Sequence, residues 1–88
     1  MAEPHIKLFA LSTCSHCRSV KRFLDEQGAE YEVVDVDLLD SAQRKAAIEQ
    51  VRHYNERVSF PTTVIGDSVV IGNKRREIYE ALTQVHNA

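Results

Sequence analysis

The sequence has few of the residues on which several classes of protein depend. It contains no tryptophan, two cysteines, two prolines and three glycines among 88 residues. Its 11 basic side chains are outnumbered by 13 acidic ones, so it lacks the cationic excess with which nucleic-acid binders cover phosphates. No apolar run approaches the roughly 20 residues that span a bilayer, and the N-terminus lacks the basic and then apolar order of a signal peptide. We therefore expect a cytoplasmic protein that binds neither nucleic acid nor membrane.

The length of the chain limits it to one small domain. Eighty-eight residues leave no room for a second core, and no linker, repeat or low-complexity segment divides them. Each proline and glycine falls where an element is expected to begin or end, which is how compact domains use these residues. We expect residues 1–88 to form a single domain that acts as a monomer.

The two cysteines, Cys14 and Cys17, have the spacing C-x-x-C. They are too close to staple a small secreted fold, because the loop between them is very short. In a reducing compartment such a pair is catalytic or binds a metal. A structural zinc site usually needs four ligands, but there is no second C-x-x-C and the four histidines are scattered, so we expect no metal site. The remaining alternative is a pair of small buried hydrophobic residues at a helix start.

Hydrophobic periodicity predicts seven elements in the order β-α-β-α-β-β-α. Strands are expected over residues 5–11, 31–37, 58–65 and 68–72. Helices are expected over 15–27, where Gly28 follows as a C-terminal cap, after a cap at Asp40 or Ser41, and after a cap at Asn73. The first β-α-β unit predicts parallel strands with a right-handed crossover, and the turn at 66–67 predicts an antiparallel hairpin. The chain is thus expected to be an α/β protein with a small mixed sheet.

The same periodicity predicts which side chains are buried. In the first strand, Ile6, Leu8 and Ala10 share one face, while Lys7 and Phe9 share the other. The inner face of the second helix is expected to carry Ala47, Ile48, Val51 and Tyr54, and that of the last helix Ile78, Ala81, Leu82 and Val85.

The helix start beside the cysteines favours a reactive thiolate at Cys14. Unpaired N–H groups and the helix dipole stabilise an anion there, and the thiolate is the nucleophile of disulfide exchange. Cys17 lies about one turn further, so Cys14 is expected to attack and Cys17 to resolve the mixed disulfide. Ser15 can donate hydrogen bonds near the sulfur, and a cationic His16 would lower the pKa of Cys14. The alternative for His16 is an exposed polar residue with no electrostatic role.

Pro61 is unusual because a proline rarely stands at the start of a strand. A proline there must face away from the ladder or follow a cis peptide bond. A cis bond would present the backbone of Phe60 to an extended thiol substrate, whereas a trans proline would only open the strand. The residues alone leave both alternatives open.

The chain resembles the glutaredoxins and the glutaredoxin-like hydrogen donors of ribonucleotide reductase in four stretches that occur in the same order. These are Thr-Cys-Ser-His-Cys, Tyr-Glu-Val-Val-Asp-Val-Asp, Phe-Pro-Thr-Thr-Val-Ile-Gly-Asp and Val-Val-Ile-Gly. The resemblance extends from about His5 to Leu82. It implies a thioredoxin-like fold, in which a four-stranded mixed sheet is flanked by three helices, with a cis peptide at Phe60–Pro61. It also implies a thiol-disulfide oxidoreductase that reduces protein or glutathione mixed disulfides through Cys14 and Cys17.

The resemblance also implies the partners. Glutathione is the expected co-substrate, and no covalently bound cofactor is expected. The oxidised protein would be recycled by glutathione or, as a hydrogen donor, by a thioredoxin-reductase-like flavoprotein.

Three departures from the glutaredoxin pattern bear on the substrate. Ser15-His16 replaces the Pro-Tyr of many glutaredoxins. The change is either neutral drift or implies a shifted redox poise or room for an iron–sulfur cluster held between two subunits, as in an iron–sulfur carrier. After Gly72, Asn73 can bind a γ-glutamyl group and Lys74 or Arg75 a carboxylate, although this stretch is equally explained as a solvated basic helix start. The segment 52–58 is longer than usual, and the sequence suggests only a partner contact for it.

Overall fold

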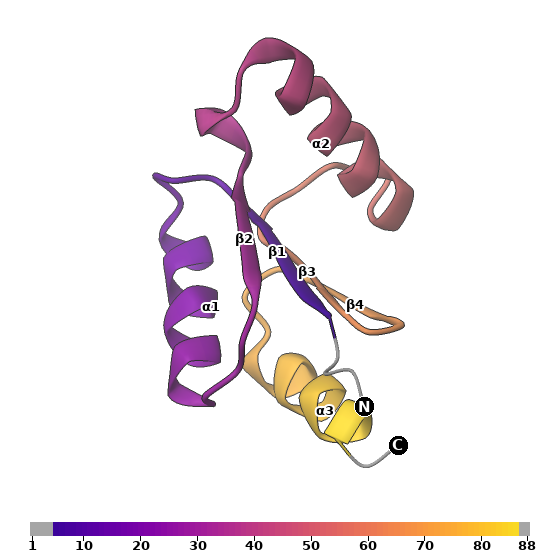
Figure 1. The fold of residues 1–88 in the computed structure, drawn as a ribbon. Coiled ribbons are helices and arrows are strands. Elements are labelled where there is room, and N and C mark those ends of the chain that lie inside the picture. The colour runs from indigo at the N-terminus through magenta and orange to yellow at the C-terminus, as the bar shows by residue number, and fades with distance from the viewer. Residues whose placement is uncertain (1–4, 87–88) are drawn as a thin grey trace.

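The structure, a computed structural model, describes residues 5–86. It contains four strands and three helices, with one short 3-10 turn (Figure 1). In chain order these are β1 (Ile6–Ala10), α1 (Ser15–Glu26), β2 (Glu32–Asp35), the 3-10 turn η1 (Val36–Leu38), α2 (Ser41–Tyr54), β3 (Thr62–Ile65), β4 (Ser68–Ile71) and α3 (Arg75–His86). The order of strands and helices is the predicted one. None of the helices within residues 5–86 is long and apolar enough to cross a membrane.

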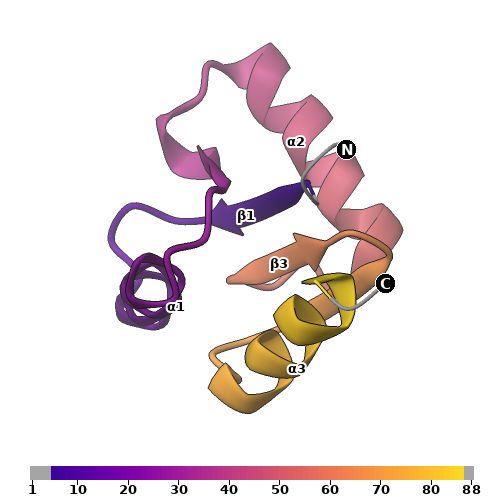
Figure 2. The same cartoon turned by 60° about the horizontal axis from the view of Figure 1, so that its bottom comes forward.

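The strands form one mixed sheet in the order β2-β1-β3-β4. Strand β1 pairs parallel to β2 and antiparallel to β3, and β4 pairs antiparallel to β3 across the hairpin. Helices α1 and α3 cover one face of the sheet and α2 lies on the other (Figures 1 and 2). The predicted thioredoxin-like architecture is therefore confirmed. The start of α1 follows shortly after β1, which is a central strand of the sheet.

Alternation in β1 divides the core between the two faces of the sheet. Ile6, Leu8 and Ala10 belong to the large cluster beneath α1 and α3, as predicted. Phe9 points to the other face, where it packs with Val51 of α2 and with Val64. A strand that is apolar on both faces is typical of a buried central strand, and it gives the loop before α1 a rigid base.

Helix α1 ends in a Schellman motif, which confirms the predicted glycine cap. Gly28 has a φ of +69°, and its N–H donates to the carbonyl of Asp25 at 3.0 Å. The N–H of Ala29 donates to the carbonyl of Leu24 at 3.1 Å, so two of the last carbonyls of the helix are satisfied. Asp40 caps α2 by accepting a hydrogen bond from the N–H of Gln43 at 2.8 Å.

Four local predictions were wrong. The strand predicted over 58–65 begins only at Thr62, because residues 58–61 belong to a loop that does not pair with the sheet. Strand β2 ends at Asp35 instead of residue 37, because the chain turns into η1. Tyr54 is 42% exposed, since α2 ends there and extends past the core. Asn73 does not precede α3 directly: the carbonyl of Lys74 accepts the first helical hydrogen bond, from Ile78. The side chain of Val85, predicted to be buried, lies outside the described residues.

Candidate active site

Cys14 occupies the N-cap position of α1, directly after a turn at residues 12–13. Its φ and ψ are −85° and 121°, and its N–H donates to the carbonyl of Leu11 at 3.1 Å. Its Sγ accepts a hydrogen bond from the N–H of Cys17 at 3.3 Å. The sulfur therefore takes the place of the Ser, Thr or Asp oxygen that usually caps a helix, and it faces the positive end of the helix dipole.

The surroundings of Cys14 favour its thiolate. Partial burial alone would raise the pKa of this thiol. The side-chain hydrogen bond with Cys17, the amide N–H groups of Cys17 and His16, and the charge of Arg18 together outweigh burial, so the pKa of Cys14 lies below its ordinary value. Cys14 is only partly buried, whereas Cys17 is buried.

Cys17 has the opposite environment. Its side chain is 0% exposed and belongs to the core cluster beneath α1. Burial, followed by the hydrogen bond and the charge of the Cys14 sulfur, raises the pKa of Cys17 to about 11. The pair thus combines an accessible, acidic thiol with a buried, neutral one, which suits the roles of attacking and resolving cysteine.

A cavity of about 320 Å³ lies beside the first turn of α1. Three segments that are distant in sequence meet there, namely the turn after Cys14, the loop before β3 and the loop before α3. Its lining residues are His16, Phe60, Pro61, Gly72, Asn73 and Lys74. The cavity therefore brings together five of the residues predicted to act in catalysis or binding, together with Gly72.

The peptide bond between Phe60 and Pro61 is cis, as the resemblance implied. The carbonyl of Pro61 accepts a hydrogen bond from the N–H of Gly72 at 2.8 Å, which joins two walls of the cavity. Among residues 5–86, nothing pairs with the backbone N–H or carbonyl of Phe60. These two groups are free to bind an extended chain placed along the cavity.

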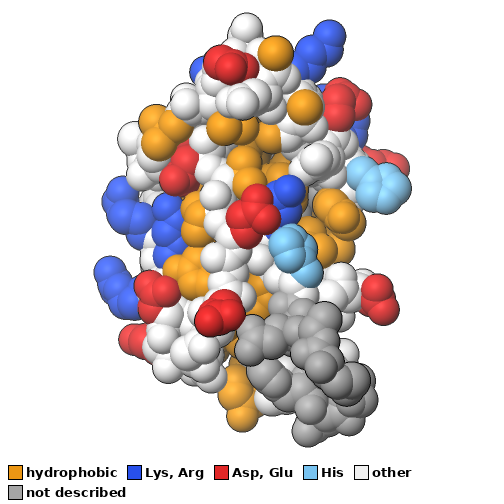
Figure 3. Space-filling model, viewed as in Figure 1, with side chains coloured by type: hydrophobic (Ala, Val, Ile, Leu, Met, Phe, Trp, Pro, Cys, Tyr) orange, Lys and Arg blue, Asp and Glu red, His pale blue; other side chains and the backbone are white. Residues whose placement is uncertain are grey.

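The basic residues near the cavity have different surroundings. Lys74 is exposed at the cavity rim and lies 3.8 Å from a carboxylate oxygen of Glu77. The guanidinium of Arg75 instead stacks over the ring of Phe23 at 5.6 Å, so it links α3 to α1. Further Lys and Arg side chains gather on the side of the molecule where α1 lies (Figure 3). Helix α1 itself carries Arg18, Lys21 and Arg22.

The remaining predicted residues lie in the same region. Ser15 and His16 are exposed in the first turn of α1, and His16 lines the cavity. Their side-chain roles stay predictions, as does the binding role of Arg75. Within residues 5–86, no three His, Cys, Asp or Glu side chains are grouped so that they can hold a metal ion.

Sequence reasoning missed the clamp that holds the loop before Cys14. Asp37 of η1 accepts one hydrogen bond from the N–H of Ser12 at 2.8 Å and another from its hydroxyl at 2.5 Å. The hydroxyl and amide of Ser12, with a smaller contribution from Arg44, hold the pKa of Asp37 below its ordinary range. The acidic residues at the end of the second predicted strand could have indicated this contact, because the parallel strands β1 and β2 end at the same edge of the sheet.

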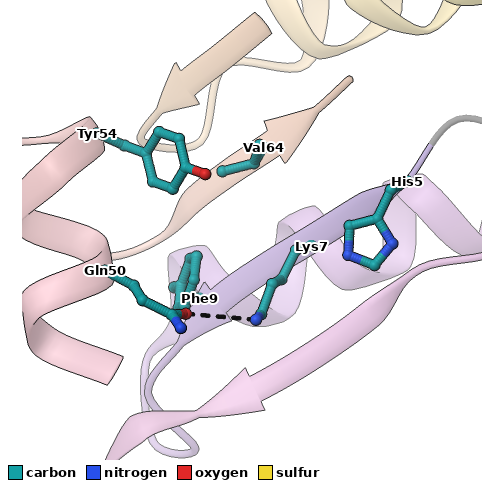
Figure 4. Close-up of a pocket in the computed structure, with 6 residues that line it drawn as sticks. All are labelled: His5, Lys7, Phe9, Gln50, Tyr54 and Val64. Atoms are coloured by element: carbon teal, nitrogen blue, oxygen red, sulfur yellow. Dashed lines mark hydrogen bonds between the residues drawn. The ribbon is translucent and has the colours of Figure 1, made fainter. Parts of the chain in front are cut away.

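A second hollow of about 300 Å³ lies on the opposite face of the sheet, beside α2 (Figure 4). Its floor is Phe9 and Val64, and the hydroxyl end of Tyr54 points toward Val64. At its rim Lys7 donates to the side-chain oxygen of Gln50 at 3.3 Å and lies 3.9 Å from Glu32. None of its lining residues is a cysteine or one of the predicted site residues.

Comparisons with known proteins agree with this geometry. The family model described as glutaredoxin matches residues 6–70. Methanoredoxin of Methanosarcina acetivorans is 40% identical, with 89% of this chain and 83% of that chain aligned and a TM-score of 0.86. The glutaredoxin Grx-1 of Archaeoglobus fulgidus is 33% identical over 90% of this chain and 86% of that chain, also with a TM-score of 0.86.

A third relative is more distant in sequence. It is an uncharacterised glutaredoxin-like 8.6 kDa protein of the rubredoxin operon of Clostridium pasteurianum, 25% identical over 73 residues, or 83% of this chain and 91% of that protein. The family match covers most of the chain, and it includes both cysteines and the cis proline. With its thioredoxin-like fold and its Cys14–Cys17 pair, the chain belongs to the glutaredoxin family.

Proposed function

We propose that the protein is a thiol-disulfide oxidoreductase that reduces protein disulfides or glutathione mixed disulfides. The observation that carries this proposal is the asymmetry of the cysteine pair: the pKa of the accessible Cys14 is lowered and that of the buried Cys17 is raised to about 11. A pair kept as a dithiol requires a reducing compartment, so we place the protein in the cytoplasm, where it acts as a monomer.

The reaction uses each sulfur once. The Cys14 thiolate attacks one sulfur of the substrate disulfide, a new S–S bond forms, and the other substrate sulfur leaves as a thiolate that takes up a proton. Cys17 then loses its proton and attacks the Sγ of Cys14, which releases the second substrate thiol. Two electrons pass to the substrate, and Cys14 and Cys17 end as a disulfide. Two molecules of glutathione, or a thioredoxin-reductase-like flavoprotein, restore the dithiol.

The cavity beside the first turn of α1 is our proposed binding site for glutathione and for substrate chains. The first turn of α1 and the start of α3 both border it, so the positive ends of two helix dipoles favour an anionic ligand. Asn73 and Lys74 offer an amide and a cation to the carboxylates of glutathione, and the free backbone of Phe60 pairs with its peptide. Arg75 contributes positive potential from its position over Phe23.

Reversing the charge of Lys74 is expected to weaken binding of glutathionylated substrates. We expect Lys74→Glu to raise the KM for a small glutathione mixed disulfide about three- to tenfold, with a smaller change in kcat, because the exposed amine contributes to binding. Lys45→Glu makes the same charge change on the exposed surface of α2 and is the matched control. Equal changes of KM in the two variants would show a general charge effect and contradict this site.

The reductant is tested by two coupled assays run in parallel. Oxidation of NADPH is followed with glutathione and glutathione reductase in one assay, and with thioredoxin reductase in the other. Turnover in the first assay supports glutathione use, and turnover only in the second identifies a hydrogen donor served by the flavoprotein. Absence of disulfide reduction in both assays and with a chemical dithiol would contradict the proposed function.

A further inference from the structure

Asn55 lies at the centre of a buried hydrogen-bond network in the loop between α2 and β3. It is 6% exposed and follows the last residue of α2, where its N–H donates to the carbonyl of Val51 at 2.7 Å. Its side-chain amide donates to the hydroxyl of Ser59 at 2.8 Å and to that of Thr62 at 3.4 Å. The network therefore reaches across seven positions of the chain, from the end of a helix to the first residue of a strand.

The rest of the network closes the same loop. The side-chain oxygen of Asn55 accepts from the N–H of Arg57 at 3.2 Å, and its carbonyl accepts from the N–H of Val58 at 2.9 Å. The hydroxyl of Thr62 donates to the carbonyl of Ser59 at 2.8 Å. Each polar group of the Asn55 side chain thus has a partner, as a buried amide requires.

Val58 shows that this loop shape is imposed on the chain. Its φ is +51°, a left-handed conformation that is strained for a β-branched residue. Such a conformation persists only where surrounding contacts hold it. Here the hydrogen bonds from the N–H groups of Arg57 and Val58 to Asn55 hold the backbone before the strained residue, and the bond from the Asn55 amide to the Ser59 hydroxyl holds the residue after it.

The network encloses the segment that forms one wall of the candidate active site. Ser59 and Thr62 directly flank Phe60 and Pro61, and both of these line the cavity beside α1. The carbonyl of Pro61 in turn receives the N–H of Gly72 at 2.8 Å, which extends the connection to the wall before α3. Asn55 itself does not line the cavity, so any effect on substrate passes through these residues.

We infer that Asn55 is a positioning residue that holds Phe60 and Pro61 in the geometry that an extended disulfide substrate needs. This inference deepens the proposed function and rests on it. It also gives a role to part of the segment 52–58, whose length sets this family member apart at the sequence level. The residue acts on substrate binding and leaves the chemistry of Cys14 unchanged, because its hydrogen bonds end at the loop.

The test compares Asn55→Ala with the wild-type protein by kinetics and by hydrogen exchange. We expect KM for a peptide mixed disulfide to rise about five- to tenfold, with kcat and the pH midpoint of Cys14 alkylation unchanged. Independently of activity, the amide of Gly72 is expected to exchange at least about tenfold faster, because its acceptor Pro61 loses support. The amide of Gly66, bonded to the carbonyl of His5 at the far end of the sheet, serves as the internal reference.

Two further variants separate positioning from loss of stability. Thr62→Val keeps the shape of the side chain but removes both of its hydrogen bonds, so it should reproduce part of the rise in KM, and the double variant should be less than additive. Tyr31→Phe removes hydrogen bonds to Asp25 and to the carbonyl of Lys21 at the other end of α1, and it should leave KM unchanged.

The possible outcomes are distinct. Unchanged KM and unchanged Gly72 exchange in Asn55→Ala, or the same rise of KM in Tyr31→Phe, would overturn the inference. If the wild-type protein reduces no disulfide, the proposed function fails. Selective acceleration of Gly72 exchange would then still support the structural connection, but the role in substrate binding would fall with the function.

Discussion

Cys14→Ser is expected to lower disulfide reduction to less than about one-thousandth of the wild-type rate. A serine hydroxyl at the same helix start is not ionised at neutral pH and forms no mixed disulfide, so the first S–S bond is never made. The measurement is reduction of a glutathione mixed disulfide and of a protein disulfide such as insulin. The far-UV spectrum and the melting temperature show whether the variant is folded.

Cys17→Ser is the matched variant, and its expected behaviour differs between substrates. Reduction of a glutathione mixed disulfide should persist, because free glutathione can resolve the mixed disulfide on Cys14. Reduction of a protein disulfide should be lost, because the buried thiol that releases the protein is missing. Reduction of either substrate by Cys14→Ser at a rate near that of the wild type would contradict the assignment of the nucleophile.

The second large effect is selective alkylation. At pH 7 iodoacetamide is expected to modify Cys14 at least about 100-fold faster than Cys17. A thiol with a pKa of about 11 has only about 10⁻⁴ of its population as thiolate at pH 7, and the side chain of Cys17 is also fully buried. The measurement is the site of modification, located by fragment-ion mass spectrometry on the peptide that carries both cysteines after timed alkylation and digestion in denaturant.

The rate of Cys14 alkylation is expected to depend on pH in a definite direction. The rate at Cys14 should rise with pH and level off once the thiolate dominates, with a midpoint below that of free cysteine, because the pKa of Cys14 is lowered. Arg18→Gln removes a positive charge that favours the thiolate, so its midpoint should move upward. A midpoint at or above that of free cysteine, or equal rates at the two cysteines, would contradict the asymmetry on which the proposed function depends.

Local sequence signals were enough for the elements and for the chemical centre. The alternation of Ile6, Leu8 and Ala10 with Lys7 and Phe9 predicts a central strand, because the side-chain period of a strand is two. The glycine at 28 ends α1 because it accepts a positive φ at no steric cost. Likewise, a cysteine directly before a helix meets free N–H groups wherever the helix lies in the fold.

Only part of the cavity lining could be predicted from the sequence. Its residues come from positions 16, 60–61 and 72–74, and the sequence alone does not place three loops beside one another. The family resemblance supplied that connection for the cis proline and for Asn73 and Lys74. The sequence predicted that Arg75 binds a carboxylate of the substrate. In the structure the guanidinium of Arg75 lies over Phe23, and this position depends on how α1 and α3 pack.

By itself the sequence determined the order of the elements, the helix start at Cys14 and the family, because each depends on residues that are neighbours in the chain. The tertiary structure alone decided the clamp between Ser12 and Asp37 and the network of Asn55 behind Phe60 and Pro61. These features depend on distances between segments that the sheet and its two helical layers bring together. Their physical basis is burial and hydrogen bonding, and both are set only once the chain has packed.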